Sequence, residues 1–282
     1  MKMIKSFLYK WLPQSETICN VCFSKEVHRR RFTYHGMVPS NFQVARKSMD
    51  FLLCETCGYS FCKENFKDYV ALGAKDISNP KRNTRVGDGI NPGREFFMAI
   101  DMIDFFLKKN SSQKKVRILI FAPGNSLDHQ LLRKHKAVAE CVVTDLRNFQ
   151  DSEYFVPLET NKKFDIVIAC EVAEHFMYPR KEFANLLRYI GNEGILVIST
   201  SMRQHKNLSY SLYPFLFGHT SYYSEESLVF LSKMNNVFVN FRVPVGETFN
   251  SKTKRYIYMT KSAEVQKGIT HFFSEEKVPR CE

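Results

Sequence analysis

The pattern of apolar and polar residues in the C-terminal two thirds of the chain predicts a sheet that is covered on both faces. Short apolar runs, rich in β-branched residues, occur at residues 116–122, 141–144, 164–169 and 194–200. Such runs are too short for helices and too apolar for half-exposed strands. They alternate with predicted helices at residues 93–110, from about residue 127, and at 179–190. This order predicts βα units around a doubly wound, mostly parallel sheet.

The end of this pattern departs from parallel pairing. Two further apolar segments, 237–245 and 255–260, are separated by a polar turn, which predicts an antiparallel hairpin at the edge of the sheet. We therefore predict an α/β domain over residues 93–262, followed by a polar C-terminal tail at residues 263–282.

Four of the eight cysteines form two C-x-x-C pairs near the start of the chain. Cys19 and Cys22 make the first pair, and Cys54 and Cys57 make the second pair after an interval of 31 residues. Each pair places two thiolates so that both bind one ion from a tight turn. Short strands are predicted between the pairs, at residues 30–34 and 49–53. The pattern predicts a zinc-ribbon-like module over residues 1–65, with a structural zinc ion because four thiolates leave no open coordination position.

Other interpretations of these thiols are a set of reduced cysteines and a redox pair. Cys62, His28 and His35 lie near the pairs in the sequence and are alternative ligands. Residues 66–92 are rich in turn residues and predict a linker between the two domains. The linker contains a basic cluster of Lys81, Arg82 and Arg85. That cluster is either an anion contact or part of a solvated connection.

Composition and charge narrow the class of partner. The chain has 282 residues, of which 44% are hydrophobic and 25% charged, as in globular proteins. A net charge of +12 favours nucleic acid, nucleotide-linked substrates or an anionic membrane surface, although scattered charge is also typical of a solvated surface. Residues 1–12 predict an amphipathic helix that packs on the protein or makes peripheral membrane contact. The sequence has no apolar stretch of about 18 residues and no cleavable signal. We therefore expect no transmembrane segment and a cytoplasmic location.

Two polar features follow the predicted strands. The first strand ends in the turn Pro123-Gly124-Asn125-Ser126 ahead of a helix, an arrangement that brings backbone N–H groups close to a ligand. The next strand ends in Asp145, which lies 21 residues beyond Gly124. An acidic residue about 20 residues beyond such a loop is typical of a contact to the ribose hydroxyls of an adenosine-containing cofactor.

Five segments in this order resemble the successive motifs of class I S-adenosylmethionine (SAM)-dependent methyltransferases over residues 93–262. They are ILIFAPGNS, VVTDL, FDIVIACEVAEHF, GNEGILVIST and FGHTSYYSEESL. The E-x-x-E-H and H-x-x-x-Y-x-E-E-S-L patterns within them resemble the small-molecule branch, and a cysteine module ahead of such a domain resembles several sugar-modifying members. The resemblance implies a seven-stranded, Rossmann-like sheet and SAM as the cofactor.

The resemblance also implies roles for single residues. Asp145 would hold the ribose of the cofactor, Ala122, Gly124 and Asn125 would line its loop, and Cys170 and Glu171 would border its methionine end. The chain departs from the family at Ile120, where the family usually has an acid, and at two of three glycine positions, which hold Ala122 and Ser126. The missing acid removes an expected contact to the methionine part of the cofactor.

A hydroxyl acceptor needs a base, and the candidates are His175 and His219, with Glu174 beside them. Other interpretations are a cap or packing role for His175 and an ordinary loop position for His219. A further interpretation is that these three residues and Glu171 ligate a second, divalent cation. That pattern resembles the metal site of small-RNA 3′-terminal 2′-O-methyltransferases and also occurs in quinone-type members.

Three hypotheses about function follow. The first is methyl transfer to a hydroxyl, or to carbon or nitrogen, of a sugar or another small molecule, such as a nucleotide-linked sugar or a glycan, with the aromatic segment 210–223 covering the acceptor. The second is an RNA or protein methyltransferase, which the positive charge favours and the lack of an RNA-binding motif disfavours. The third is a non-catalytic module of methyltransferase fold. Nothing in the sequence predicts the oligomeric state.

Overall fold

The structure is a computed structural model that describes residues 17–40, 44, 46–65, 86–109, 115–146, 148, 152–204, 207–244 and 253–275. The predicted N-terminal amphipathic helix and the basic cluster of the linker lie outside the described residues. Among the helices that are described, none combines the length and the apolar character that a membrane span requires.

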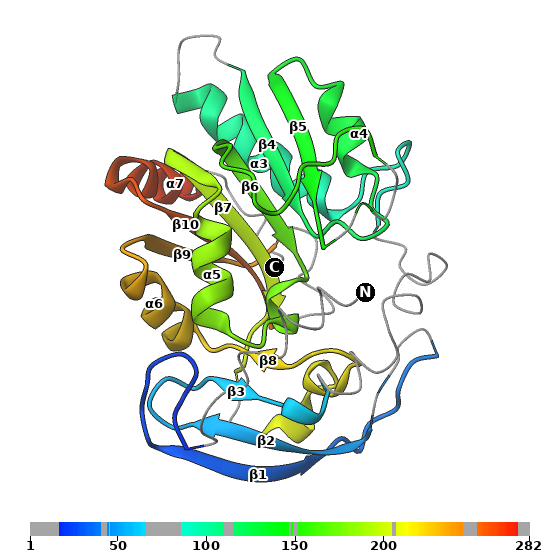
Figure 1. The fold of residues 1–282 in the computed structure, drawn as a ribbon, viewed down its shortest axis with the longest axis vertical. Helices are drawn as coiled ribbons and strands as arrows, with labels where there is room; N and C mark the ends of the chain where they lie inside the picture. Colours follow the sequence, from blue (N-terminus) through cyan, green and yellow to red (C-terminus); the bar gives the residue numbers. More distant parts are fainter. Residues whose placement is uncertain are drawn as a thin grey trace.

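A mixed sheet of six strands forms the centre of the larger domain, in the order β5-β4-β6-β7-β10-β9 (Figure 1). The strands are β4 (Val116–Phe121), β5 (Val138–Thr144), β6 (Phe164–Cys170), β7 (Ile190–Ser201), β9 (Phe238–Arg242) and β10 (Lys254–Thr260). β5, β4, β6 and β7 are parallel, and β10 is antiparallel to both β7 and β9. The predicted hairpin with a reversed strand is confirmed.

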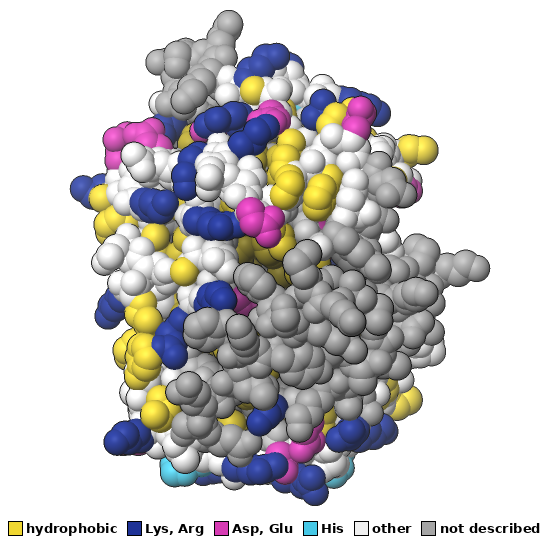
Figure 2. Space-filling model, in the orientation of Figure 1, with side chains coloured by type: hydrophobic (Ala, Val, Ile, Leu, Met, Phe, Trp, Pro, Cys, Tyr) yellow, Lys and Arg dark blue, Asp and Glu magenta, His cyan; other side chains and the backbone are white. Residues whose placement is uncertain are grey.

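Positive charge is distributed over the surface. On the face drawn in Figure 2, Lys and Arg side chains are spread over both the large sheet and the N-terminal part, without forming one patch. Some of the positive charge is paired: Arg29 and Arg31 share the single carboxylate of Asp50, each at 3.0 Å. On this face, the arrangement fits the interpretation of a solvated surface.

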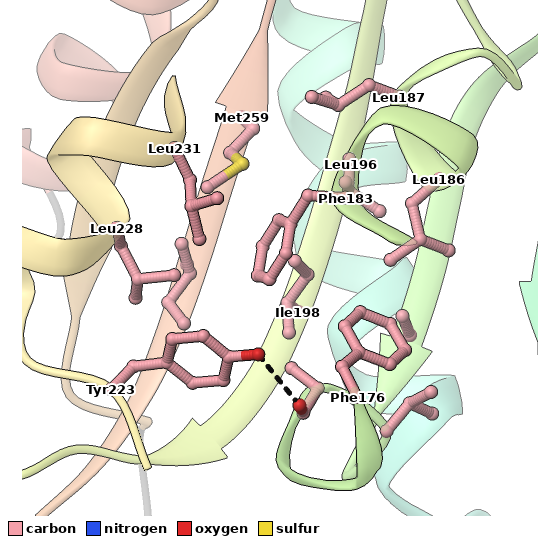
Figure 3. Close-up of a cluster of buried hydrophobic side chains, with 14 of the residues drawn as sticks. Phe176, Phe183, Leu186, Leu187, Leu196, Ile198, Tyr223, Leu228, Leu231 and Met259 are labelled. Atoms are coloured by element: carbon pink, nitrogen blue, oxygen red, sulfur yellow. Dashed lines mark hydrogen bonds between the residues drawn. The ribbon is translucent and has the colours of Figure 1, made fainter. Parts of the chain in front are cut away.

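Helices cover both faces of the sheet, as predicted. The helices are α3 (Arg94–Lys109), α4 (Asp128–Arg133), α5 (Pro179–Leu187), α6 (Glu225–Met234) and α7 (Ala263–Glu275). One buried core joins α3, α4 and α7 to one face of the sheet, and a second joins α5 and α6 to the other. Figure 3 shows the second core, in which Phe183 of α5 and Leu231 of α6 face Ile198 of β7. The predicted tail thus begins with α7, whose Val265 and Ile269 are fully buried.

The seven strands implied by the resemblance are wrong, because the described sheet has six. The segment between β5 and β6 contacts β5 through a single parallel bridge from Phe155 to Val143. The pairing stops after Val156, whose N–H donates to the Val143 carbonyl oxygen at 2.9 Å. The chain then turns, and the Pro157 carbonyl oxygen accepts a hydrogen bond from the Thr160 N–H at 3.0 Å.

A second, antiparallel sheet has the order β1-β2-β3-β8. Its strands are β1 (Val27–Thr33), β2 (Ser48–Cys54), β3 (Ser60–Phe61) and β8 (Ser221–Tyr222). β8 belongs to the predicted methyltransferase domain, and it pairs with β3 through Ser60 and Phe61. The Tyr59 and Ser221 hydroxyls lie 2.6 Å apart in the buried contact between the two parts. The N-terminal module is therefore joined to the larger domain by strand pairing.

Candidate active site

The loop after β4 lies at the carboxyl ends of the parallel strands, where open α/β sheets have their ligand crevice. Ala122 and Gly124 adopt left-handed backbone conformations, with φ values of 52° and 56°. A side chain at Gly124 would meet no atom within 4 Å, so the space in front of this glycine is open. The left-handed conformation costs about 1–2 kcal/mol for a residue such as Ala122 and is typical of functional loops. The fold holds it through a 2.7 Å hydrogen bond from the Ala122 N–H to the Thr144 carbonyl oxygen.

The structure brings the predicted cofactor residues to one edge of the sheet. Asp145 directly follows β5, and Ala122, Gly124 and Asn125 form the loop after β4. The neighbouring strand β6 ends in Cys170, with Glu171 next in the chain. Ile120 pairs with Ile168, so the ends of β4 and β6 are adjacent. The assigned contacts with a cofactor stay predictions.

Glu171 is held in a strained, ionic environment. Its φ is 54°, its N–H donates to the Ser199 carbonyl oxygen at 3.0 Å, and the Ser199 hydroxyl donates to its Oε1 at 2.8 Å. The ammonium of Lys254 and the guanidinium of Arg94 both pair with its Oε2. Burial raises the pKa of Glu171, but these two cations outweigh burial and hold the pKa below its ordinary value. Glu171 is therefore ionised at neutral pH.

Two charged residues of the crevice, Arg94 and Glu95, were missed by the sequence analysis. They are the first residues of α3, which Asp128 anchors by accepting hydrogen bonds from the Gly93 and Phe96 N–H groups at 2.7 and 3.1 Å. The Ser126 hydroxyl donates to Glu95 Oε2 at 3.2 Å. Glu95 is only 7% exposed, and burial raises its pKa to about 7. The sequence carried no signal for them, because charged residues in a first helical turn are usually solvated.

A carboxyl group and two imidazoles meet just beyond Glu171. One ligand atom each from Glu174, His175 and His219 lies within 4.8 Å of the others. Glu174 and His175 belong to the short helix η2 (Ala173–His175), and His219 comes from the loop before β8. The His175 Nδ1–H donates to the Gly218 carbonyl oxygen at 2.9 Å, and the Thr220 N–H donates to the Glu174 carbonyl oxygen at 2.8 Å. These bonds explain why residues so far apart in the sequence meet.

The core and the aromatic segment fix this cluster. Figure 3 shows the Tyr223 hydroxyl donating to a carbonyl oxygen of η2, that of Ala173, at 3.0 Å. The aromatic segment contains η3 (Leu208–Tyr210) and η4 (Tyr213–Phe215). The ring of Tyr213 lies 4.4 Å from the His219 ring, centroid to centroid.

Burial determines the charge of the cluster. Glu174 is 1% exposed, and burial together with the charge of Glu171 raises its pKa to about 8. Burial lowers the pKa of His175, and burial with the neighbouring His175 holds the pKa of His219 well below its ordinary value. Both imidazoles are therefore neutral at pH 7 and carry a lone pair for a proton or a cation. Glu171 faces Lys254 and Arg94 and does not belong to this cluster.

The sequence matches a protein-family model described as "Methyltransferase domain" over residues 93–235, which is just over half of the chain. The chain belongs to this methyltransferase family. The predicted enzyme class, a SAM-dependent methyltransferase, is thereby confirmed. A search among curated proteins finds no match to the sequence.

Several solved structures are similar to the methyltransferase domain. A CurJ carbon methyltransferase matches at 14% identity with a TM-score of 0.42, over 59% of this chain and 54% of that chain. An O-methyltransferase family protein from Burkholderia thailandensis matches at 14% identity with a TM-score of 0.41, over 60% of this chain and 57% of that chain. The plantazolicin methyltransferase BpumL matches at 13% identity with a TM-score of 0.44, over 58% of this chain and 84% of that chain. The match thus spans about half of the CurJ chain, and none of these likenesses bears on the acceptor.

The four paired cysteines also come together in the structure. Cys19 and Cys57 Sγ lie 3.6 Å apart, Cys22 and Cys54 Sγ lie 3.5 Å apart, and all four sulfurs lie within 4.8 Å of one another. Sulfurs bound at about 2.3 Å to one tetrahedral zinc ion are separated by about 3.8 Å, so the arrangement fits zinc. The pKa of the Cys19 thiol is lowered to about 5, mainly because the neighbouring Cys57 thiol hydrogen-bonds to it.

The turns and the neighbouring residues support the same assignment. Phe23 and Gly58 directly follow the two pairs, and each adopts a left-handed conformation, with φ values of 64° and 69°. Cys62 is buried elsewhere, 3.9 Å from the Met49 sulfur, and the other candidate ligands His28 and His35 are exposed. Zinc at the four-cysteine cluster stays a prediction that the geometry fits.

Proposed function

We propose that this chain transfers a methyl group from SAM to a hydroxyl group of a small, sugar-like acceptor. The observation that carries the proposal is the cluster of the buried Glu174 and the half-buried His175 and His219, of which Glu174 and His175 follow β6 closely in the chain. When bound, SAM supplies an electrophilic methyl group on a sulfonium. The protein must then hold the acceptor hydroxyl in line with that methyl and accept its proton.

The residues of the crevice would hold the cofactor. Asp145 accepts hydrogen bonds from the ribose hydroxyls, and the open space at Gly124 admits the cofactor against the loop backbone. Ala122 and Glu171, which directly follow β4 and β6, both adopt left-handed conformations of the kind found at functional loops.

His175 is the base in this proposal. Its Nδ1–H is engaged by the Gly218 carbonyl oxygen, so the basic lone pair lies on Nε2 and the orientation of the ring is fixed. Burial keeps the imidazole neutral, which is the form that accepts a proton. The ring of His219 packs against that of His175, with 5.1 Å between the centroids. In this proposal His219 binds the acceptor hydroxyl next to His175 Nε2.

The size of the acceptor follows from what surrounds the cluster. Tyr213 packs on His219, and its hydroxyl lies 2.9 Å from that of Thr200. Tyr210 of η3 is 79% exposed and offers an aromatic face of the kind on which sugar rings pack. β8 begins two residues after His219 and pairs with β3 of the N-terminal module. In this proposal the module therefore forms one wall of the acceptor site. These features favour a compact polyol such as a nucleotide-linked sugar or a glycan end.

The test is formation of S-adenosylhomocysteine (SAH) when the protein is incubated with SAM and sets of nucleotide sugars, glycans, small amines and RNA. Mass spectrometry of the product locates the methyl group. The proposal predicts an O-methylated sugar product, whose formation His175→Ala slows at least about 100-fold. Transfer only to nitrogen, carbon or RNA would contradict it.

A second candidate is methylation of a terminal ribose diol of RNA with the help of a divalent cation. The observation that favours it is the same cluster, because two neutral imidazoles and the Glu174 carboxyl, which a bound cation would deprotonate, lie within 4.8 Å and are a suitable donor set for such an ion. Dependence of turnover on added Mg²⁺ or Mn²⁺, loss with chelator, and RNA binding that weakens steeply with salt would select this candidate over the first.

A further inference from the structure

A tight turn over residues 216–219 carries His219 and the carbonyl group that orients His175. The His219 N–H donates to the Leu216 carbonyl oxygen at 3.1 Å, and Gly218 has a φ of 80°. This combination is typical of a type II β-turn, whose third residue needs a positive φ. Such a turn pairs only one N–H with one carbonyl group internally, so its other backbone groups need partners from elsewhere.

One side chain of the N-terminal module, that of Asn65, meets three backbone groups of this turn. Asn65 Nδ2 donates to the carbonyl oxygens of Leu216 and His219, at 2.6 and 2.9 Å. Its Oδ1 accepts from the Gly218 N–H at 3.0 Å. A primary amide has two N–H donors and one carbonyl acceptor, which match these three partners. Because Asn65 is fully buried and Gly218 is buried, loss of these bonds would leave costly unpaired groups, so the amide specifies the shape of the turn.

The N-terminal sheet in turn fixes the position of Asn65. The residue follows β3 closely in the chain, and the Cys62 N–H between them donates to the Thr220 carbonyl oxygen at 2.8 Å. This bond extends the pairing of β3 with β8. Val44 of the same module makes an isolated antiparallel bridge to Leu216. The module therefore holds the turn from two sides of its own fold.

The turn passes this constraint on to both imidazoles. The Gly218 carbonyl oxygen accepts the Nδ1–H of His175 at 2.9 Å, which leaves the lone pair of that ring on Nε2. His219 is the last residue of the turn, and its ring lies 5.1 Å from that of His175. If the turn changed shape, the Nδ1–H would lose its acceptor, and the His175 ring would be free to adopt either tautomer.

We propose that Asn65 is a positioning residue of the active site, which holds the turn at residues 216–219 and thereby the orientation and tautomer of His175. This inference rests on the proposed function, in which His175 is the base. It gives the N-terminal module a part in methyl transfer beyond that of a wall of the acceptor site. Because Asn65 acts through the turn, its replacement should not disturb cofactor binding at the ends of β4, β5 and β6.

Histidine-selective ¹⁵N NMR of the full chain tests the assignment without cofactor or acceptor, because the two ring nitrogens differ in chemical shift according to which carries the proton. In the unaltered protein, His175 should be in the Nδ1–H form at neutral pH, and its signals are the ones that His175→Ala removes. Asn65→Leu deletes all three hydrogen bonds at similar side-chain volume. It should convert His175 to a mixture of the two tautomers.

The matched control is Asn235→Leu. Asn235 likewise donates through its amide to a backbone carbonyl oxygen, that of Leu231 at 2.8 Å, but at the end of α6. Its replacement should leave the His175 signals unchanged. Should Asn65→Leu fail to unfold cooperatively, Asn65→Ser is the second variant. Its smaller side chain avoids overpacking, and one hydroxyl does not replace two N–H donors, so the tautomer should shift in the same direction.

Kinetics and calorimetry give a readout that a merely structural role would not move. Asn65→Leu should lower kcat about 10- to 100-fold, because a small displacement of a catalytic group is costly, while the affinity for SAH stays within about twofold. An unaltered protein without the Nδ1–H form, an unchanged tautomer or kcat in the folded variant, or an equal loss of SAH affinity would overturn the proposal. If the unaltered protein shows the expected tautomer but methylates no acceptor, the proposed function fails instead, and the tautomer in Asn65→Leu still decides whether Asn65 holds the ring.

Discussion

The imidazole rings of His175 and His219 lie 5.1 Å apart, centroid to centroid, at an interplanar angle of 89°. The sequence alone left open whether His219 joins the residues that follow β6. The pairing arises because the loop before β8 bonds to η2 through the Gly218 carbonyl and the Thr220 N–H. We therefore expect an acceptor that binds beside η2 to meet both rings together.

Replacement of either histidine should slow methyl transfer. We expect His175→Ala to reduce turnover by about 100-fold or more, as for loss of a general base. His219→Ala should raise the KM for the acceptor more than it lowers kcat, because His219 positions the hydroxyl. Rates of SAH release at varied acceptor concentration measure both parameters. The exposed His271 of α7 provides the control, and His271→Ala should leave the rate unchanged. Full turnover in both active-site variants would show that neither ring takes part.

The four-cysteine cluster should hold one zinc ion per chain. We expect Cys54→Ser with Cys57→Ser to abolish the zinc content and to lower the melting temperature, because the binding energy of a structural zinc ion contributes to folding. Elemental analysis of the purified protein and thermal unfolding with and without a strong chelator measure the two effects. Cys62→Ser is the matched control, since Cys62 is equally buried but lies outside the cluster and should retain the zinc. Zinc-free protein with unchanged stability would contradict the assignment.

The hydrophobic pattern predicted most of the large sheet because its inner strands are covered on both faces. The run at 164–169 became β6, in which Val167 and Ile168 are fully buried between helices. The implied number of seven strands was wrong for a local reason. Phe155 makes only one bridge to β5 before the chain turns at residues 157–160, and nothing in the periodicity distinguishes such a bridge from a short strand.

Other features were beyond the reach of the sequence because they depend on distant pairing. β8 has two residues, and it carries no pattern that would assign it to the N-terminal sheet. Arg94 and Glu95 are at the start of an amphipathic helix, and their burial depends on where Asp128 anchors that helix. By contrast, the sequence singles out the C-x-x-C pairs and Asp145 as candidates because their spacing carries a chemical meaning by itself.

The strand pairing between β3 and β8 should contribute to the stability of the whole chain. We expect Tyr59→Phe to lower the free energy of unfolding by about 1 kcal/mol, because the buried Ser221 hydroxyl, which still donates to the Phe176 carbonyl oxygen, loses its 2.6 Å hydrogen bond with Tyr59. Denaturant unfolding followed by fluorescence gives this value. Tyr210→Phe makes the same chemical change at a 79% exposed position and should alter stability by less than about 0.5 kcal/mol. Equal effects of the two variants would mean that the joint between the sheets contributes nothing.

Asp145 provides a second test of the crevice. Asp145→Ala should weaken SAH at least about tenfold while leaving the melting temperature of the unliganded protein within a few degrees, because one charge-assisted contact to the ribose is lost. Asp165→Ala is the matched control, since Asp165 lies near the opposite end of the parallel strand β6, which β4 separates from β5. Unchanged affinity in Asp145→Ala would refute the ribose contact.

The central claim is that the crevice at the ends of β4, β5 and β6 binds SAM, and calorimetric titration of the full chain with SAH tests it most directly. We predict saturable binding of one SAH per chain, with a melting temperature that rises with ligand concentration as mass action requires. Absence of binding heat, together with an unchanged melting temperature at millimolar SAH, would contradict the account and leave the chain as a non-catalytic module of methyltransferase fold.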